Sequence, residues 1–243
     1  MSVPGKLYGV GVGPGDPDLM TLKAARVLAR APVVAHFRKR GRPGHARSIA
    51  EGMLAPGALE LPLDYPLTTE VPFVSDAYRS ATTAFYDAAA RNLAGHLAAG
   101  RDVALLCEGD PFFYGSFMHI YHRLAGAHQV EVIPGITGMS ACWTRAGTPI
   151  THGDDVLTVL PGTLALDALI ERMRVADALV VMKLGSNFDK VRRALTQTGL
   201  ADRAIYVERG SMAGEIVLPL RDKSGNEAPY FAMILVPGRG RCL

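Results

Sequence analysis

The first half of the chain alternates short apolar runs with segments in which apolar residues recur at helical spacing. The apolar runs predict strands at residues 7–12, 33–37, 59–63, 103–107 and 130–133. The periodic segments predict helices at 19–29 and 117–124, and one or two helices over 74–99. Apolar strands that alternate with helices are typical of a parallel sheet covered on both faces. We therefore predict an α/β domain over residues 1–134.

After residue 134 the pattern changes, because strand candidates outnumber helices. Strands are predicted at residues 156–160, 179–184, 205–208, 215–218 and 230–236, and helices at 139–146, 164–173 and 189–195. No helix separates the last two strands, so we expect them to be antiparallel neighbours. Residues 135–243 are thus predicted to form a second α/β domain with a mixed sheet.

Composition narrows the class of protein. Of the 243 residues 49% are hydrophobic, which predicts a folded chain with a substantial core. The net charge of +3 is too mild to indicate nucleic-acid binding by itself. No apolar run approaches the roughly 18 residues that a membrane span needs, and the N-terminus lacks a signal-peptide layout. We expect a cytoplasmic protein that binds neither membranes nor nucleic acid.

The cysteines and the closest histidine pair do not indicate a metal site. Cys107, Cys142 and Cys242 are far apart and odd in number, so they form neither a metal pair nor a disulfide framework. His119 and His122 are three residues apart on a predicted helix, but no third ligand has suitable spacing. We expect reduced core thiols at the first two cysteines, packing or surface roles for the histidines, and no metal.

A glycine-rich turn, GVGVGPGDP at residues 9–17, follows the first predicted strand. The dinucleotide-binding fingerprint needs glycines at i, i+2 and i+5, but the fifth residue after Gly9 is Pro14. Asp16 and Asp18 would also repel a pyrophosphate. The turn instead offers backbone that another group can approach closely, or it serves chain reversal alone.

A second turn, LCEGDPFFYGS at residues 106–116, follows the clearest strand of the first half. In open α/β sheets ligands bind beyond the carboxyl ends of the strands. By the predicted strand ends, the turns at Gly13 and Gly109 both lie there. The two turns are therefore expected to face one crevice.

These motifs resemble the tetrapyrrole methylase family. The resemblance rests on GVGPGDPDLMTLKA (residues 11–24), CEGDPFFYGSF (107–117) and EVIPGITGMSA (131–141), and it continues through VVMKLG (180–185), YVERGSM (206–212) and PYFAMILV (229–236). It covers nearly the whole chain. Within the family, residues 106–124 and 38–86 resemble the branch that methylates carbon 20 of precorrin-2 on the way to cobalamin.

The resemblance implies a fold of two α/β domains, distinct from the Rossmann-type methyltransferases, with S-adenosylmethionine in the cleft between them, and a homodimer. The N-terminal domain would be the substrate side and the C-terminal domain the cofactor side. Family positions that contact the cofactor map onto Pro14, Gly109, Asp110, Pro111, Phe112, Thr137, Gly138, Met182, Ser211, Met212 and Ala213. Seen alone, Met182 could equally be core, and Thr137 could merely cap a helix.

The implied chemistry asks little of the side chains. A reduced tetrapyrrole supplies an enamine-like carbon and the sulfonium is already activated, so positioning gives most of the acceleration. A proton must then leave the methylated carbon. Asp110 is the predicted proton acceptor and Lys183 is predicted to pair with substrate carboxylates, while Glu108 and Tyr114 are further candidates. Asp110 could instead bond its own backbone, as turn residues do.

A basic cluster follows the second predicted strand. It comprises Arg38, Lys39, Arg40, Arg42 and Arg47. Because arginine binds carboxylates in bidentate geometry, we predict that Arg38 and Arg40, with Tyr114, contact the polyacidic macrocycle. These basic residues could equally well lie in a solvated loop that binds no ligand.

Other functions remain open from the sequence. The substrate could be a cobalt-containing factor II, or the methylated position could be elsewhere on the ring. An RNA methyltransferase of the same fold would use the basic loop, although that loop lacks the interleaved aromatic residues that single-stranded nucleic acid favours. A non-catalytic tetrapyrrole or nucleotide carrier would bind its ligand without consuming the methyl donor.

Overall fold

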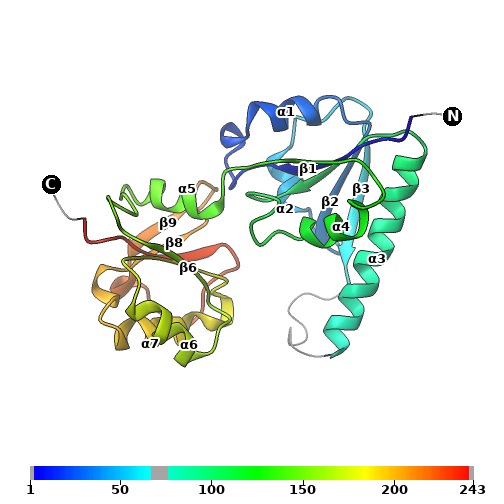
Figure 1. The fold of residues 1–243 in the computed structure, drawn as a ribbon. Helices are drawn as coiled ribbons and strands as arrows, with labels where there is room; N and C mark the ends of the chain where they lie inside the picture. Colours follow the sequence, from blue (N-terminus) through cyan, green and yellow to red (C-terminus); the bar gives the residue numbers. More distant parts are fainter. Residues whose placement is uncertain (1–2, 67–75, 241–243) are drawn as a thin grey trace. The chain divides into compact units, whose positions relative to one another are not determined.

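The computed structural model describes residues 3–66 and 76–240, so Cys242 lies outside the described residues. Contacts divide the chain into two compact units, one ending at Thr137 and the other beginning at Gly138 (Figure 1). No helix among the described residues is long and apolar enough to cross a membrane.

The first unit contains a sheet of five strands, all paired in parallel. The strands are β1 (Leu7–Gly11), β2 (Val33–Lys39), β3 (Leu59–Tyr65), β4 (Val103–Cys107) and β5 (Val130–Ile133), in the order β3-β2-β4-β1-β5. The predicted parallel sheet is confirmed. Every residue of the central strand β4 is buried, as expected of a strand covered on both faces.

Helices cover both faces of this sheet. They are α1 (Leu22–Leu28), α2 (His45–Ile49), α3 (Asp76–Ala98) and α4 (Phe117–Leu124). Side chains alternate along β4, so Leu105 packs in one cluster with Leu93 of α3 and Phe117 of α4. Leu106 packs in the other cluster with Leu28 of α1 and Ile49 of α2.

The first predicted helix, at residues 19–29, is wrong at its start. The chain forms a short 3-10 turn, η1 (Pro17–Leu19), and then begins α1 at Leu22. Asp16 Oδ1 accepts a bond from the Asp18 N–H, and Thr21 Oγ1 accepts one from the Ala24 N–H at 3.2 Å. Each short polar side chain captures a backbone donor and so starts its own turn.

One helix was not predicted, and the structure decides between one and two helices for another. Helix α2 was not predicted, because five residues carry too little apolar periodicity; it forms where Ala46 and Ile49 are buried against the sheet. Helix α3 is one continuous helix from Asp76, and the predicted helical residues 74 and 75 lie outside the described residues.

The second unit contains a mixed sheet, as predicted. Its strands are β6 (Leu157–Pro161), β7 (Ala178–Met182), β8 (Ile205–Glu208), β9 (Ile216–Pro219) and β10 (Ala232–Val236), in the order β6-β7-β10-β8-β9. Strands β6 and β7 are parallel, and the other three pairings are antiparallel.

The predicted pairing of the last two strands is wrong. Strand β8 lies between β9 and β10 and is antiparallel to both, so β9 and β10 run parallel without touching in the sheet. Burial explains the order. Strand β10 is almost entirely buried and occupies the centre, whereas β9 is mostly exposed and lies at the edge.

Helices also cover both faces of the second sheet, as Figure 1 shows. Helices α6 (Leu166–Arg174) and α7 (Phe188–Gln197) pack on one face, where Leu169 and Val191 join Ile234 of β10. Helix α5 (Gly138–Arg145) lies on the other face, where Cys142 packs with Leu235. Three short 3-10 turns complete the unit: η2 (Gly185–Asn187), η3 (Ala201–Arg203) and η4 (Leu220–Asp222).

Candidate active site

The turns after β1 and β4 meet at one edge of the first sheet. These strands are parallel neighbours, so their carboxyl ends lie together. The Gly109 N–H donates to the Gly13 carbonyl oxygen at 2.8 Å, and the two residues form an isolated bridge. The two turns singled out in the sequence are therefore in direct contact, with Pro14 and Asp110 following the paired glycines.

A third turn, after β5, packs its backbone directly against the end of β1 and the turn after β4. A Cβ on Gly11 would lie 2.6 Å from the Gly135 nitrogen and 2.7 Å from the Gly109 carbonyl oxygen. A Cβ on Gly135 would overlap the same carbonyl oxygen. Since rigid backbone cannot yield to a side chain, these positions require glycine. The group that approaches the glycine-rich turn so closely is thus another part of the protein.

The side chain of Asp110 links the turn after β4 to the turn after β5. Its Oδ1 accepts a hydrogen bond from the Phe112 N–H at 2.9 Å, and its Oδ2 accepts one from the Gly135 N–H at 3.1 Å. The backbone-bonding alternative for Asp110 is therefore present in the structure. Each carboxylate oxygen keeps a second lone pair, so proton acceptance stays chemically available.

Glu108 lies on the α2 side of the sheet, as the alternation of side chains along β4 dictates. The side chain is partly buried, and the backbone N–H of Ala46 in α2 donates to its carboxylate. Burial raises the pKa of Glu108 from 4.5 to about 7, against the opposing effect of that N–H. Its carboxyl can therefore gain or lose a proton near neutral pH.

The predicted substrate and cofactor residues of the turn after β4 differ in burial. Pro111 is buried, whereas Phe112 and Tyr114 are 48% and 43% exposed. The Phe112 ring packs against Tyr121 of α4, with centroids 5.0 Å apart. Thus one face of the Phe112 side chain is supported by α4 and much of the rest is open to solvent.

Left-handed backbone conformations recur in the loops that follow β4, β7 and β8. The non-glycine residues concerned are Tyr114 (φ 56), Lys183 (φ 57), Arg209 (φ 52) and Ser211 (φ 64). Such conformations cost free energy and persist only where the surroundings enforce them, which is common at ligand sites. Three of these four residues were singled out from the sequence.

In the second unit the predicted residues gather at one edge of the sheet. Strands β7 and β8 are both antiparallel to β10, so they run parallel to each other and their carboxyl ends share an edge. Met182 ends β7 and Lys183 follows it, while Ser211, Met212 and Ala213 follow β8. Gly138 begins α5 on the neighbouring face.

Ser211 combines a strained backbone with an unsatisfied side chain. Its N–H donates to Glu215 Oε2 at 2.7 Å. Its buried hydroxyl finds no hydrogen-bond partner within residues 3–66 and 76–240. A buried polar atom without a partner is rare in folded proteins and is suited to a polar atom of a ligand.

The basic cluster is partly neutralised within the first unit. Arg38 Nε donates to Asp64 Oδ1 at 2.6 Å, and Arg47 binds both oxygens of Glu60 at 2.5 and 2.8 Å. The guanidinium of Arg38 holds the pKa of Asp64 below its ordinary value. Arg40 is exposed, whereas Arg38 is only partly exposed and already holds an ion pair.

The remaining candidates have structural explanations. The His119 ring stacks on Tyr86 with centroids 4.3 Å apart, which is a packing role. In the part of the chain that the structure describes, no three His, Cys, Asp or Glu side chains gather so as to hold a metal ion. Burial raises the pKa of the Cys107 and Cys142 thiols, so both are unreactive core residues.

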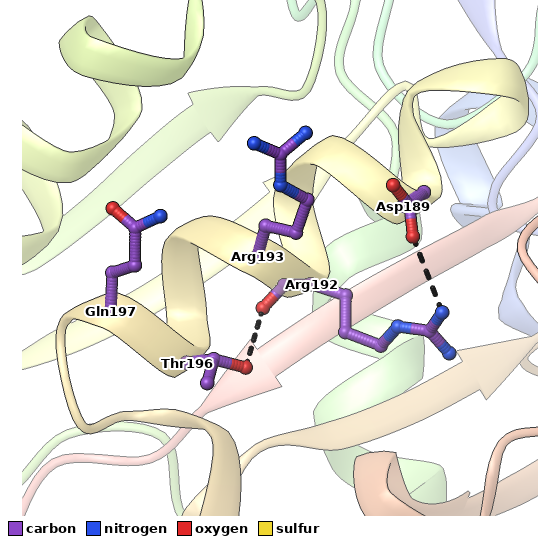
Figure 2. Close-up of a pocket in the computed structure, with 5 residues that line it drawn as sticks. All are labelled: Asp189, Arg192, Arg193, Thr196 and Gln197. Atoms are coloured by element: carbon purple, nitrogen blue, oxygen red, sulfur yellow. Dashed lines mark hydrogen bonds and ion pairs between the residues drawn. The ribbon is translucent and has the colours of Figure 1, made fainter.

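A hollow on the second unit lies outside all of these positions. Figure 2 shows it along helix α7, lined by Asp189, Arg192, Arg193, Thr196 and Gln197. The Arg192 guanidinium is turned toward Asp189, 3.3 Å away, and it also binds Asn226. The five residues lie on one face of a single helix, and Asp189 and Arg192 already pair with each other, so few groups converge on a ligand.

Three residues at the two sheet edges were not identified from the sequence: Gly135, Arg145 and Glu215. Gly135 follows a predicted strand just as Gly13 and Gly109 follow theirs, so the same signal could have found it. Arg145 and Glu215 are 70 residues apart and become neighbours only through the fold.

With this geometry established, comparisons with known proteins identify the family. The sequence matches the family described as Tetrapyrrole (Corrin/Porphyrin) Methylases over residues 6–223. The chain belongs to the tetrapyrrole methylase family. The predicted family and fold class are therefore confirmed.

Individual relatives of this family cover almost the whole chain. Precorrin-2 C(20)-methyltransferase from Sinorhizobium sp is 54% identical over 234 residues, 96% of either chain. Cobalt-precorrin-2 C(20)-methyltransferase from Salmonella typhimurium is 26% identical over 96% of either chain. Among solved structures, uroporphyrin-III C-methyltransferase from Thermus thermophilus, complexed with S-adenosyl homocysteine, is 27% identical with a TM-score of 0.67, over 96% of this chain and 92% of that one.

The raised pKa of Glu108 predicts a pH-dependent stability difference. Between its unfolded value near 4.5 and its folded value of about 7, the folded state binds more protons, so wild-type stability falls as pH rises through this range. Replacing Glu108 by Gln removes this loss, which is at most about 3 kcal/mol. Urea unfolding at several pH values from about 5 to about 8 measures the free energy of unfolding of both proteins. The value for Glu108→Gln should rise relative to that of wild type as the pH increases.

A matched control is Glu131→Gln. The ammonium groups of Lys23 and Lys6 lower the pKa of Glu131 to about 2, so its titration lies well below the ordinary value of 4.5. The difference in free energy of unfolding between this control variant and wild type should stay constant over the same pH range. An equally constant difference for Glu108→Gln would show that Glu108 does not titrate near neutrality.

Proposed function

We propose that this protein is an S-adenosylmethionine-dependent methyltransferase that methylates carbon 20 of precorrin-2, giving precorrin-3A in cobalamin biosynthesis. The observation that carries the proposal is the 54% identity, over 96% of both chains, with the Sinorhizobium precorrin-2 C(20)-methyltransferase. The Salmonella enzyme named for the cobalt-containing substrate is only 26% identical. This difference favours the metal-free macrocycle over the cobalt-containing one.

The residues present suit the methyl donor. S-adenosylmethionine carries no phosphate, so its site does not need a basic loop or a dinucleotide fingerprint. The site requires hydrogen-bonding groups, from the backbone and from side chains such as the unsatisfied Ser211 hydroxyl. It also requires apolar surface, which Met182 at the end of β7 supplies. The proposed contacts are Pro14, Gly109, Asp110, Pro111, Phe112, Thr137, Gly138, Met182, Ser211, Met212 and Ala213.

When bound, the donor supplies an activated methyl group, and the chain's residues position and deprotonate the substrate. Asp110, oriented by its bonds to the Phe112 and Gly135 N–H groups, accepts the proton lost from the ring carbon. Lys183, exposed on its left-handed turn, pairs with a substrate carboxylate, and Tyr114 and Arg40 contact the ring periphery. Residues 1–134 thus serve mainly the substrate and residues 135–243 mainly the donor.

We also propose that the protein is a cytoplasmic homodimer, as the family resemblance implies. Light scattering on the purified full chain gives the mass in solution directly. A monomer over the working concentration range would rule out the dimer.

The direct test of the function is incubation of precorrin-2 with the protein and isotopically labelled S-adenosylmethionine. Mass spectrometry should show one added labelled methyl group, and NMR of the product should place it on carbon 20. Cobalt-factor II and RNA serve as parallel substrates. Methylation elsewhere on the ring, preference for either parallel substrate, or binding of precorrin-2 without consumption of the donor would each refute the proposal.

Asp110 provides a test of the proton-transfer step. Asp110→Asn keeps one oxygen acceptor for a backbone N–H but cannot accept the proton, so kcat should fall by about a hundredfold or more. The thermal midpoint and the affinity for S-adenosylhomocysteine should also fall, because an amide NH2 replaces one of the two oxygens that accept backbone N–H groups, but the affinity should fall by much less than kcat. Full turnover in this variant would remove the catalytic role, leaving Asp110 as the link between the two turns.

Arg40 and Arg38 test recognition of the macrocycle. Arg40→Met should raise KM for the tetrapyrrole several-fold at unchanged KM for the donor, because it removes a carboxylate partner. Arg38→Met should raise the same KM less, since Asp64 already occupies part of its guanidinium. Arg91→Met, on the exposed face of α3, is the matched control. Unchanged KM in both loop variants would refute substrate binding by this loop.

A further inference from the structure

The loop between β8 and β9 has an unusually constrained backbone. Arg209 (φ 52), Ser211 (φ 64) and Gly214 (φ 74) are all left-handed within six residues, and two of them are not glycine. The loop leads into an exposed edge strand, which provides little support from that end. Because such conformations are costly, contacts from elsewhere must stabilise the loop.

The carboxylate of Glu215 supplies these contacts. Its Oε2 accepts the Ser211 N–H at 2.7 Å, which closes the loop on itself. Arg145 Nε, from the last turn of α5, lies 2.8 and 2.9 Å from the two Glu215 oxygens. The Glu215 side chain is 18% exposed, so its bonds are shielded from water, although Arg145 is 56% exposed.

A second, independent contact joins the same loop to α5. A Cβ on Gly210 would lie 2.9 Å from the Cys142 sulfur and 3.3 Å from the Cys142 Cα. The loop backbone therefore lies directly on α5. The helix itself is fixed on the sheet, where Cys142 packs in a core cluster with Val207 and Leu235.

The two segments joined in this way both belong to the proposed donor site. Helix α5 begins at Gly138, and the loop carries Ser211 with its buried, unsatisfied hydroxyl. Ser211 thus offers its hydroxyl to a ligand while its own N–H donates to Glu215. Loss of Glu215 would free this residue to leave its left-handed conformation.

We propose that the Arg145–Glu215 ion pair positions the loop of residues 209–215 for binding of the methyl donor. The inference rests on the proposed function. Arg145 and Glu215 are positioning residues that act through Ser211, and Glu215 is the principal one because it bonds the loop backbone itself. A half-exposed ion pair contributes little to global stability, so the main effect is on the fraction of molecules whose loop is ready to bind.

The test is calorimetric titration of S-adenosylhomocysteine into the full-length protein and its variants. Glu215→Ala removes both the ion pair and the backbone acceptor, and should weaken binding by about tenfold or more. Glu215→Gln retains an amide oxygen for the Ser211 N–H and Arg145→Met removes only the cation, so each should weaken binding several-fold. Arg172→Met, which removes a surface pair on α6 with Glu171 at 3.8 Å, is the matched control and should bind as wild type does.

Three further readouts separate positioning from general destabilisation. The double variant Arg145→Met, Glu215→Gln should bind no more weakly than the weaker single variant, because both remove one interaction. Thermal midpoints of the Arg145→Met and Glu215→Gln variants should stay close to that of wild type. KM for the tetrapyrrole at saturating donor should not change.

Two results would overturn the inference, and they differ in what else they affect. If wild type binds S-adenosylhomocysteine and all Glu215 and Arg145 variants bind it equally well, the positioning role is refuted while the proposed function stands. If wild type itself does not bind S-adenosylhomocysteine, the proposed function falls as well. Should Glu215→Ala fail to fold, the milder Glu215→Gln and Arg145→Met variants decide the question.

Discussion

The close packing of three backbone turns at the carboxyl edge of the first sheet is the constraint on which the rest depends. Because β4, β1 and β5 are adjacent and parallel, the turns that follow them converge, and Gly11 and Gly135 leave no room for a Cβ. Asp110 then bonds to two of these turns through both of its oxygens. Pro14, Phe112 and Tyr114, which are among the residues proposed to meet the donor or the substrate, lie on these turns.

The second unit achieves a similar result by different means. Its loops after β7 and β8 contain non-glycine residues in left-handed conformations. Side chains stabilise these loops, whereas the turns of the first unit pack through glycine backbone. Glu215 is the clearest case, since one carboxylate binds the loop backbone and the α5 arginine together. Fixed loops of this kind suit a reaction in which orientation supplies most of the acceleration.

Charge in the first unit is largely used to build structure. Arg38 and Arg47 of the basic cluster pair with Asp64 and Glu60 of β3, which fixes the segment containing α2 beside the sheet. Glu108 receives an N–H from that same helix. A dense run of arginines in a sequence is therefore a poor measure of the charge available to a substrate.

The sequence by itself determined the two α/β units, the parallel and mixed sheets and the family, because hydrophobic periodicity and turn motifs are local and survive without knowledge of the fold. Through motif resemblance it also singled out Asp110, Lys183 and Ser211 as candidate site residues. Only the tertiary structure decided that β10 lies at the centre of its sheet and that Arg38 is already paired. It alone joined Arg145 to Glu215. These features depend on burial and on contacts between residues far apart in the chain, which no local pattern encodes.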